Sequence, residues 1–372
     1  MATIIYVDGT LITGNNNGTS WIDAYRGCAG LQTALDSVAN GSNTIIYIRN
    51  TFSVGTYGST IDIDTAGGDY TNNSWLKIIG CDSAGGNPLQ EGQYVILDGE
   101  NLLSSHILNV SNVSMIQIEN VHLTRVSASG KAGCYLTASG SKYGFNFINC
   151  KFSFCSYGLY APTYNNRNLY IYKCEFLNNS SYDFYSLVSM LIMAGNRFKS
   201  ACPAIFTTLG GVIRGCIFEY TQNSGTAVTI NGHITMRGDA VITNCTFYCT
   251  GTGGVTAIGC NNMVGPVITN NIIYLAQPGT DYPISAVRIN YEDYNCTNAT
   301  VHLLAGSHSL NATDPQFADA ANGNFRSRNP LVLRGGMPDF SNNPGQIGAV
   351  LQKYQFAKRW QAANPARISI FK

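Results

Sequence analysis

Eight segments of the chain repeat one six-residue pattern, and this repeat restricts the possible folds more than any other feature. The first residue is apolar, the third is usually Asn or Gly, the fourth is small or apolar, and the sixth is mostly apolar. The segments occupy residues 78–83, 118–123, 147–152, 171–176, 193–198, 213–218, 242–247 and 268–273. From Ile118 onward their first residues lie 29, 24, 22, 20, 29 and 26 positions apart. A recurring unit of this size, with connections of variable length, is typical of a solenoid.

The pattern predicts a bend at its third position. Side chains of a strand alternate between two faces, so positions 1 and 3 of a straight strand would share a face. The apolar positions are instead 1, 4 and 6, which requires a change of parity after the first residue. The third positions hold Gly80, Asn120, Asn149, Lys173, Gly195, Gly215, Asn244 and Asn270. Because Gly and Asn enter the left-handed region at least cost, we predict two strands joined by one left-handed residue in each turn.

The remaining apolar positions predict columns of like residues inside the solenoid. In a parallel stack, successive coils lie about 4.8 Å apart and equivalent side chains pile on one another. The fourth position places Cys81, Val121, Cys150, Cys174, Cys216 and Cys245 inward, and the sixth stacks Phe152, Phe176, Phe198, Phe218 and Phe247. The chain has 12 cysteines. Because five of them fall in this inward column, we interpret the cysteines as buried, reduced thiols rather than disulfides.

This repeat resembles the right-handed parallel β-helix of the pectate-lyase-like superfamily, whose coils carry an asparagine-lined bend between two strands. Helical solenoids are excluded, because they need apolar residues at a spacing of three and four. At the start, Leu31, Leu35 and Val38 fall on one face of a helix that would cover the first coil. Residues 314–319, 323–325 and 347–349 resemble the closing segment of bacterial and phage β-helix proteins.

The resemblance predicts an all-β chain, a single-stranded right-handed parallel β-helix with additions at both ends. We expect an N-terminal cap with a short helix in residues 1–50 and the β-helix in residues 51–350. A basic, aromatic tail follows in residues 351–372. Each coil of a solenoid packs only on its neighbours, so one continuous domain of this length is allowed.

Composition and charge exclude several classes of partner. The chain is 45% hydrophobic and 12% charged, with a formal net charge of +1. Such a balance argues against nucleic acid as the main partner. The start of the chain lacks the features of a secretory signal, and the longest nearly apolar run, residues 187–194, is too short to span a bilayer. We expect no membrane partner, and synthesis in a reducing cytoplasm. No cysteine pair has zinc-type spacing, so neither a metal nor a cofactor is expected.

The sequence also lacks the motifs that the resemblance would require of an enzyme. Lyases of this fold group several aspartates around calcium with an Arg or Lys base, and hydrolases use clustered aspartates. Glu175 falls on an outward position, but the equivalent positions are Lys151 and His122 before it and Arg197 and Ile217 after it. This favours a neutralised stripe over a catalytic pair, and we predict no catalytic residues. Asp62, Asp64 and Asp69 form an acidic patch that fits a strand edge or loop, with calcium binding as the alternative.

Tyrosines provide the candidate binding surface. Seven lie between Tyr157 and Tyr185, and Tyr170 and Tyr172 flank the inward Ile171, so both should project outward. A tyrosine has an apolar ring and a polar tip, which suits sugars and protein interfaces equally. Packing under the turns of neighbouring coils is the alternative. The candidate residues are Tyr160, Tyr164, Tyr170, Tyr172, Tyr182 and Tyr185.

The tail provides a second candidate surface. No acidic residue follows Asp339, so the end of the chain is basic and aromatic. Such an extension would either cap the stack or dock on a neighbouring subunit or an acidic partner. The candidate docking residues are Tyr354, Phe356, Lys358, Arg359, Trp360, Arg367 and Phe371.

These features favour a bacteriophage virion structural protein, either a capsid decoration or a fibre or spike subunit. It would be made in the host cytoplasm, would dock on other capsid or tail proteins without catalysis, and would self-associate as a trimer or adhere to a cell-surface glycan. One alternative is a polysaccharide-degrading β-helix enzyme, a lyase or a glycoside hydrolase of the tailspike kind. Another is a secreted, extracellular adhesin. Fold alone does not separate these classes.

Overall fold

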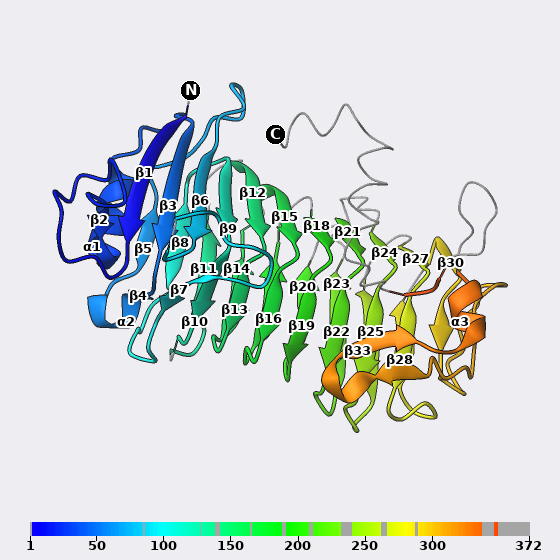
Figure 1. Ribbon diagram of the computed structural model, residues 1–372. Helices are drawn as coiled ribbons and strands as arrows, with labels where there is room; N and C mark the ends of the chain where they lie inside the picture. Colours follow the sequence, from blue (N-terminus) through cyan, green and yellow to red (C-terminus); the bar gives the residue numbers. More distant parts are fainter. Residues whose placement is uncertain are drawn as a thin grey trace.

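The computed structural model describes residues 2–84, 86–126, 128–137, 142–163, 166–187, 191–207, 211–231, 240–261, 266–286, 289–336 and 346–348. They form a parallel β-helix in which the chain passes in turn through three long parallel sheets, here called A, B and C (Figure 1). Each coil contributes one strand to each sheet, so the strand order within a sheet advances in steps of three over most of its length.

Sheet A contains the strands that precede the predicted bend. They are β1 (Thr3–Asp8), β2 (Tyr25–Arg26), β3 (Thr44–Arg49), β6 (Leu76–Cys81), β9 (Ile116–Glu119), β12 (Lys142–Ile148), β15 (Asn166–Tyr172), β18 (Leu191–Ala194), β21 (Gly211–Arg214), β24 (Val241–Thr243), β27 (Val267–Thr269) and β30 (Tyr291–Asp293).

Sheet B contains the strands that follow the bend. They are β4 (Phe52–Ser53), β7 (Val95–Asp98), β10 (Val121–Thr124), β13 (Lys151–Ser153), β16 (Glu175–Leu177), β19 (Arg197–Ser200), β22 (Ile217–Tyr220), β25 (Thr246–Cys249), β28 (Ile272–Leu275) and β31 (Cys296–Thr297).

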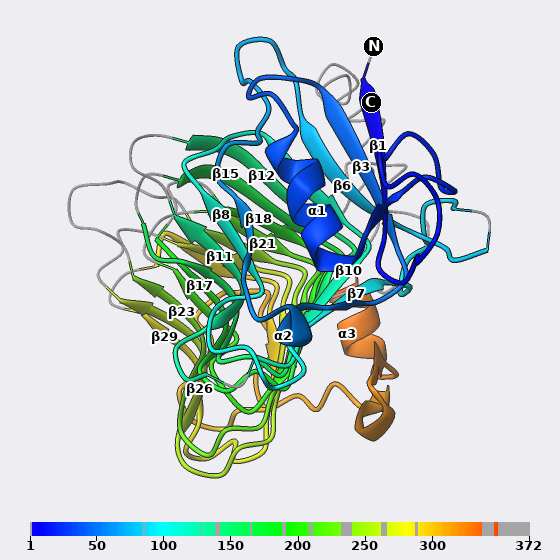
Figure 2. The same ribbon diagram turned by 90° about the vertical axis from the view of Figure 1, so that its left-hand side faces the viewer.

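Sheet C completes each coil and forms the left-hand face in Figure 2. Its strands are β5 (Ile61–Ile63), β8 (Leu108–Ser111), β11 (Ala132–Thr137), β14 (Tyr157–Ala161), β17 (Tyr182–Ser186), β20 (Ile205–Thr207), β23 (Gly225–Asn231), β26 (Val255–Asn261) and β29 (Tyr282–Ala286).

The bends between sheets A and B lie where the repeat predicts them. The third-position residues from Asn120 to Asn270 all have positive φ angles, between 46° and 66°. Asparagine side chains extend across coils here: the Asn149 amide donates to Asn120 Oδ1 at 2.6 Å, and the Asn120 amide donates to the Leu89 carbonyl at 2.9 Å. These bonds satisfy polar groups that the corner would otherwise bury.

The prediction for Gly80 is wrong. Gly80 belongs to β6, which continues without a bend to Cys81. The chain then leaves the solenoid in a long connection before β7, and Cys81 bridges to Pro88 within it. A left-handed corner is needed only where the next strand follows at once, and at Gly80 it does not.

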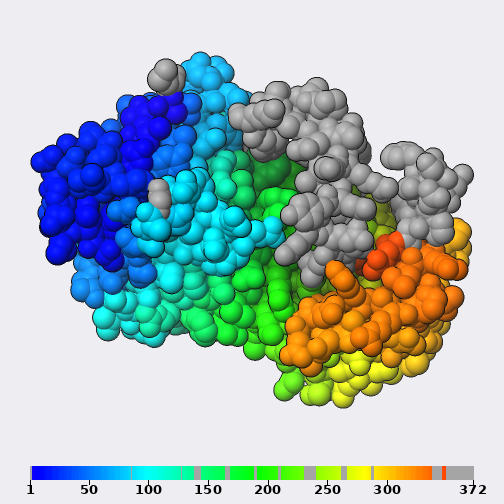
Figure 3. Space-filling model, in the orientation of Figure 1, coloured from blue at the N-terminus to red at the C-terminus, as the bar shows by residue number. Residues whose placement is uncertain are grey.

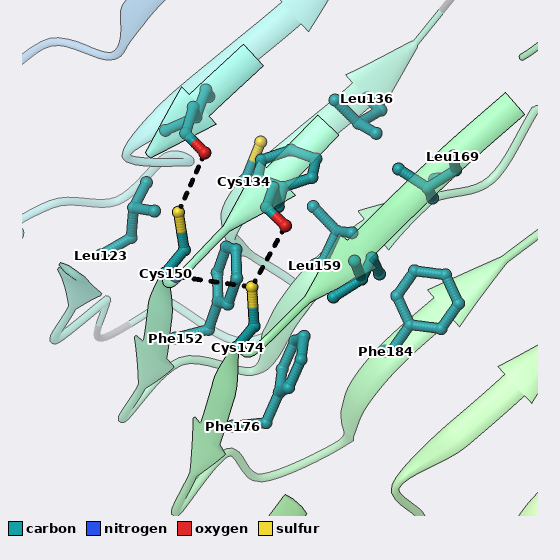
Figure 4. Packing of buried hydrophobic residues seen from close by; sticks show 14 of the residues in the cluster. Leu123, Cys134, Leu136, Cys150, Phe152, Leu159, Leu169, Cys174, Phe176 and Phe184 are labelled. Atoms are coloured by element: carbon teal, nitrogen blue, oxygen red, sulfur yellow. Dashed lines mark hydrogen bonds between the residues drawn. The ribbon is translucent and has the colours of Figure 1, made fainter. Parts of the chain in front are cut away.

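The interior consists of the predicted columns. Phe152, Phe176, Phe198, Phe218 and Phe247 are fully buried, and their ring centroids lie 4.6–4.9 Å apart with interplanar angles of 7–13°. Figure 4 shows two of these rings beside the cysteine column, where the Cys150 thiol donates to the Ile118 carbonyl at 3.3 Å. All twelve cysteines are buried and unpaired. Burial raises the pKa of the Cys155 thiol to about 12, so this thiol stays protonated.

Additional elements occupy the two ends. Helix α1 (Gly27–Asp36) contacts β1, β2 and β5, and buries Leu31 and Leu35 as predicted (Figure 2). A short helix α2 (Val54–Tyr57) follows β4.

The C-terminal elements follow β31. They are β32 (Phe317–Asp319), a 3₁₀ turn η1 (Ala320–Asn322), β33 (Asn324–Ser327) and α3 (Pro330–Arg334). The β32–β33 hairpin lies on the outer face of sheet B, where Phe325 packs against Ile217 and Tyr248 (Figure 1). No described helix combines the length and apolarity that crossing a membrane requires.

Candidate functional site: the tyrosine face of sheet C

The outer face of sheet C carries a column of aromatic residues. Tyr135, Tyr160, Tyr185 and Phe206 occupy equivalent positions on four successive strands, β11, β14, β17 and β20. Their neighbours along each strand, such as Leu159 and Phe184, are fully buried. The alternation of a strand therefore places this column on the outer face.

A second group of rings lies beside this column. Tyr157 and Tyr182 are paired on β14 and β17, and their centroids lie 6.0 Å apart. Tyr157 also stacks on Tyr160 at 4.4 Å, and His106 stacks on Tyr135 at 4.3 Å. The tyrosine face, as named here, consists of His106, Tyr135, Tyr157, Tyr160, Tyr182, Tyr185 and Phe206. Each of these residues is half-buried.

The rings of the tyrosine face pack largely on one another. Tyr135 and Tyr160 are stacked with an interplanar angle of 21°, whereas Tyr160 and Tyr185 are tilted by 59°. Parallel rings that stack along the solenoid axis cover each other's faces. The surface therefore exposes the edges of the rings and their phenol oxygens. Where two neighbouring rings are tilted against each other, part of a ring face is exposed as well. It can offer hydrogen bonds beside an apolar surface, in the manner typical of tyrosine.

Three titratable groups of this face, Tyr160, Tyr182 and His106, are neutral at neutral pH. Burial, reinforced by the neighbouring phenols, raises the pKa of Tyr160, and burial also raises the pKa of Tyr182. Burial lowers the pKa of His106 to about 4, with the nearby charge of Lys131 as a smaller cause. The Ala132 amide donates to His106 Nδ1 at 2.9 Å, so the ring proton of neutral His106 is on Nε2. The face therefore presents neutral donors.

The aromatic column changes character at both ends. Phe206 is followed in register by Thr229 and then by Gly259, which has no side chain. The Phe206 ring thus ends the aromatic stack on this side. In the other direction, Tyr135 is preceded by Asn109 and Asp62, and the Asn109 amide donates to Asp62 Oδ1 at 2.7 Å. A polar pair therefore continues the column on the N-terminal side.

The structure brings together half of the predicted tyrosines. Tyr160, Tyr182 and Tyr185 lie on the tyrosine face. Tyr170 and Tyr172 project from β15 on the outer face of sheet A, beside the buried Ile171, as predicted. Tyr164 lies outside the described residues, and so do all the candidate docking residues of the tail: Tyr354, Phe356, Lys358, Arg359, Trp360, Arg367 and Phe371.

The candidate residues did not include four members of this face, namely His106, Tyr135, Tyr157 and Phe206, although Tyr157 belongs to the tyrosine-rich segment that the sequence singled out. Tyr135 and Phe206 stand one coil before and two coils after Tyr160. The turns from sheet B to sheet C differ in length, so these positions do not align by counting. One signal could have found Tyr135 and Phe206. In the segment that follows each repeat, an aromatic residue stands next to a small or apolar residue of a strand.

The charged positions behave as the ladder predicts. His122, Lys151, Glu175, Arg197 and Ile217 are in register along the outer face of sheet B. Lys151 Nζ lies 3.4 Å from a Glu175 oxygen, which confirms that this carboxylate is neutralised.

The acidic patch near the N-terminus is divided among local interactions. Asp69 accepts the backbone N–H of Thr71 at 2.8 Å and the Asn72 amide at 2.6 Å, and Asp64 is exposed. The described part of the chain contains no group of three or more His, Cys, Asp or Glu residues placed to hold a metal ion.

The overall geometry is similar to that of several solved structures. An alginate lyase from Paenibacillus sp. str. FPU-7 matches with a TM-score of 0.50 and 13% identity, over 82% of this chain and 95% of that one. A pectate lyase, Pel9A, matches with a TM-score of 0.42 and 14% identity, over 94% and 96%. The pectin methylesterase of Aspergillus niger gives 0.41 and 14%, over 83% and 90%.

Sequence comparison adds no family. No protein-family model matches the chain. No curated protein sequence matches it either. At these identities the structural likeness shows the fold alone, and it confirms the predicted fold class. The chain has the right-handed parallel β-helix fold.

Proposed function

We propose that this protein binds a polysaccharide along the tyrosine face. The observation that carries the proposal is the run of seven aromatic side chains over successive coils, with Asn109 and Asp62 continuing it. A repeating surface with a rise of about 4.8 Å per coil presents the same contacts at regular intervals, which suits a ligand that itself repeats. The alginate lyase, which is named for a polysaccharide, has the same fold and supports this class of ligand.

Two kinds of contact would hold the glycan. Phenol tips and the His106 Nε2–H would hydrogen-bond to sugar hydroxyls, while ring edges cover the apolar face of the sugar. The Phe206 ring, at the end of the aromatic stack, would contact one further sugar ring beside Thr229. Polar groups at defined positions within an apolar surface are what orients a ligand in most binding sites.

Binding is tested by affinity electrophoresis and calorimetry with alginate, pectate and neutral glucans. The double variant Tyr160→Ala/Tyr185→Ala removes the centre of the face and should strongly weaken retention by the polysaccharide that the wild type binds. Tyr172→Ala is the matched control, because it removes an exposed tyrosine from sheet A. Equal retention of both variants would refute the tyrosine face as the site.

A second measurement asks whether the bound polysaccharide is cut, as the polysaccharide-degrading alternative predicts. Unsaturated chain ends would indicate elimination by a lyase, and new saturated reducing ends would indicate hydrolysis. Unchanged chain length, with retention intact, would leave a binding protein.

The bacteriophage interpretation stays a prediction, and so do the partners and the location that it implies. Mass spectrometry of purified particles from the source culture tests it directly. Hundreds of copies per particle would indicate capsid decoration, and a few dozen or fewer would indicate a fibre or spike. Its absence from particles would remove the virion interpretation and leave polysaccharide binding unaffected.

A further inference from the structure

A hollow lies on the outer face of sheet B, on a different sheet from the tyrosine face. Its volume is about 220 Å³, and it is lined by Glu175, Phe176, Leu177, Arg197 and Lys199 of β16 and β19. Figure 3 shows this green surface set back between the cyan connection that follows β6 and the orange C-terminal hairpin.

Two segments from outside the sheets approach the charged surface around the hollow. On the N-terminal side, Glu91 of the β6–β7 connection pairs with Lys173 at 2.6 Å, and the Tyr94 ring lies 5.9 Å from Lys151 Nζ. On the C-terminal side, the end of η1 rests on Arg197 so closely that a side chain at Gly323 would collide with the guanidinium. Two segments that are distant in sequence therefore contact charged residues on or beside the floor of the hollow.

The floor carries an excess of positive charge. Arg197 and Lys199 share a single carboxylate, Glu219, at 2.6 and 3.4 Å. Glu219 is only 7% exposed, whereas Arg197 is 39% and Lys199 is 49% exposed. One buried anion thus orients two cations whose charge it cannot fully balance. Such a pair is suited to a carboxylate or sulfate arriving from solvent.

The other side of the hollow differs in chemistry. Glu175 is 40% exposed and is paired with Lys151, so this pair is neutral overall. The Glu175 carboxylate would repel a free oxyanion but would accept hydrogen bonds from hydroxyl groups. Leu177, which is in register with Lys199, adds apolar surface to the lining. The combination fits a ligand that has an anionic group, hydroxyls and an apolar patch.

Size limits the ligand further. A water molecule takes about 30 Å³ of liquid volume, so the hollow is too large for one simple oxyanion. It is also smaller than the roughly 300–1,000 Å³ of sites that enclose drug-sized ligands. We propose that this hollow binds one acidic sugar unit, with its carboxylate or sulfate on Lys199 and Arg197 and its hydroxyls on Glu175.

Calorimetry at low salt with a galacturonate oligosaccharide, and with a neutral galactose oligosaccharide of the same length, tests the proposal. The acidic probe should bind and the neutral one should not. Lys199→Ala should weaken binding of the acidic probe by about tenfold or more, because it removes a charge-assisted hydrogen bond. Lys199→Glu should abolish this binding. Arg197 is left intact, because it also supports the hairpin.

Lys77→Ala is the matched control, since it removes the same charge from the outer face of sheet A. It should change the affinity by less than about twofold. Equal affinity for the two probes, no binding of the acidic one, or equal effects of Lys199→Ala and Lys77→Ala would each overturn the proposal. Tyr160→Ala/Tyr185→Ala should leave this binding unchanged. The proposal for the sheet B hollow and the proposal for the tyrosine face can therefore be refuted independently.

Discussion

Two aromatic ladders run along this solenoid, one inside it and one outside. The inner ladder, from Phe152 to Phe247, has rings within 13° of parallel at nearly constant spacing, and it is fully buried. The outer ladder, from Tyr135 to Phe206, has centroid spacings of 4.8–5.5 Å and angles from 8° to 59°. The parallel backbone imposes the same repeat on both.

Their surroundings explain the difference. Inner rings are confined on every side by neighbouring coils, and close packing admits one arrangement. Outer rings have solvent on one side, so each can tilt at small cost. A ladder that is not locked by packing can adapt to a ligand, whereas the inner ladder contributes chiefly to stability. The comparison thus assigns stability to one ladder and binding to the other.

The largest expected effect comes from the same substitution made in each ladder. Phe198→Ala should lower the free energy of unfolding by about 3–5 kcal/mol, because it leaves a cavity in a core that cannot collapse. Phe206→Ala, at the half-buried end of the outer ladder, should cost about 1 kcal/mol. Urea unfolding followed by tryptophan fluorescence measures both. Similar losses of unfolding free energy for the two variants would contradict the conclusion that the inner ladder contributes more to stability than the outer one.

The next prediction concerns the pH dependence of stability that a polar group inside the solenoid causes. Asp183 is fully buried, with Oδ1 accepting from Asn179 and Ser200 and with Oδ2 unpartnered among the described residues. Burial raises the pKa of this carboxyl to about 7, above about 3.9 for an unfolded chain. The folded state therefore binds the proton more tightly, so this contribution to stability is complete below pH 4 and is lost as pH rises toward 7.

The loss should be on the order of a few kcal/mol, since one pKa unit corresponds to about 1.4 kcal/mol. Unfolding of wild type and Asp183→Asn between pH 4 and 8 measures it, because the asparagine variant cannot titrate at this position. Parallel stability profiles for the two proteins would show that Asp183 does not titrate in this range.

The smallest expected effect is the loss of one phenol tip. Tyr160→Phe keeps the ring and its packing, so the free energy of unfolding should change by less than about 0.5 kcal/mol. Polysaccharide binding should nevertheless weaken, by about threefold to tenfold, if the phenol donates to the ligand. Calorimetry and urea unfolding of one preparation test both statements. A stability loss as large as that of Phe206→Ala would instead assign Tyr160 to the scaffold.

Much of the coil was predictable from the repeat itself. Asn149 and its equivalents combine a residue that tolerates positive φ with a change of parity, and both signals are local. The prediction failed at Gly80, where the same six-residue pattern precedes a long excursion rather than a second strand. A glycine permits a left-handed bend without requiring one.

The binding surfaces were predictable only in part. Tyr160, Tyr182 and Tyr185 stood out by their density, but Tyr135 and Phe206 join them only through the register of sheet C. Likewise, the sequence aligned Arg197 with Glu175, whereas the structure pairs it with Glu219 on the next strand. Alignment of equivalent positions restricts the possible partners, but side-chain direction selects among them.

The sequence by itself determined the parallel β-helix, the corner residues, and the cysteine and phenylalanine columns. These depend on strand alternation and on φ preferences, which act over a few neighbouring residues. The tertiary structure decided which outward side chains meet across coils, and it placed the C-terminal hairpin against Arg197. Such contacts depend on the lengths of irregular turns and on how distant segments pack, and no local pattern of residues encodes them.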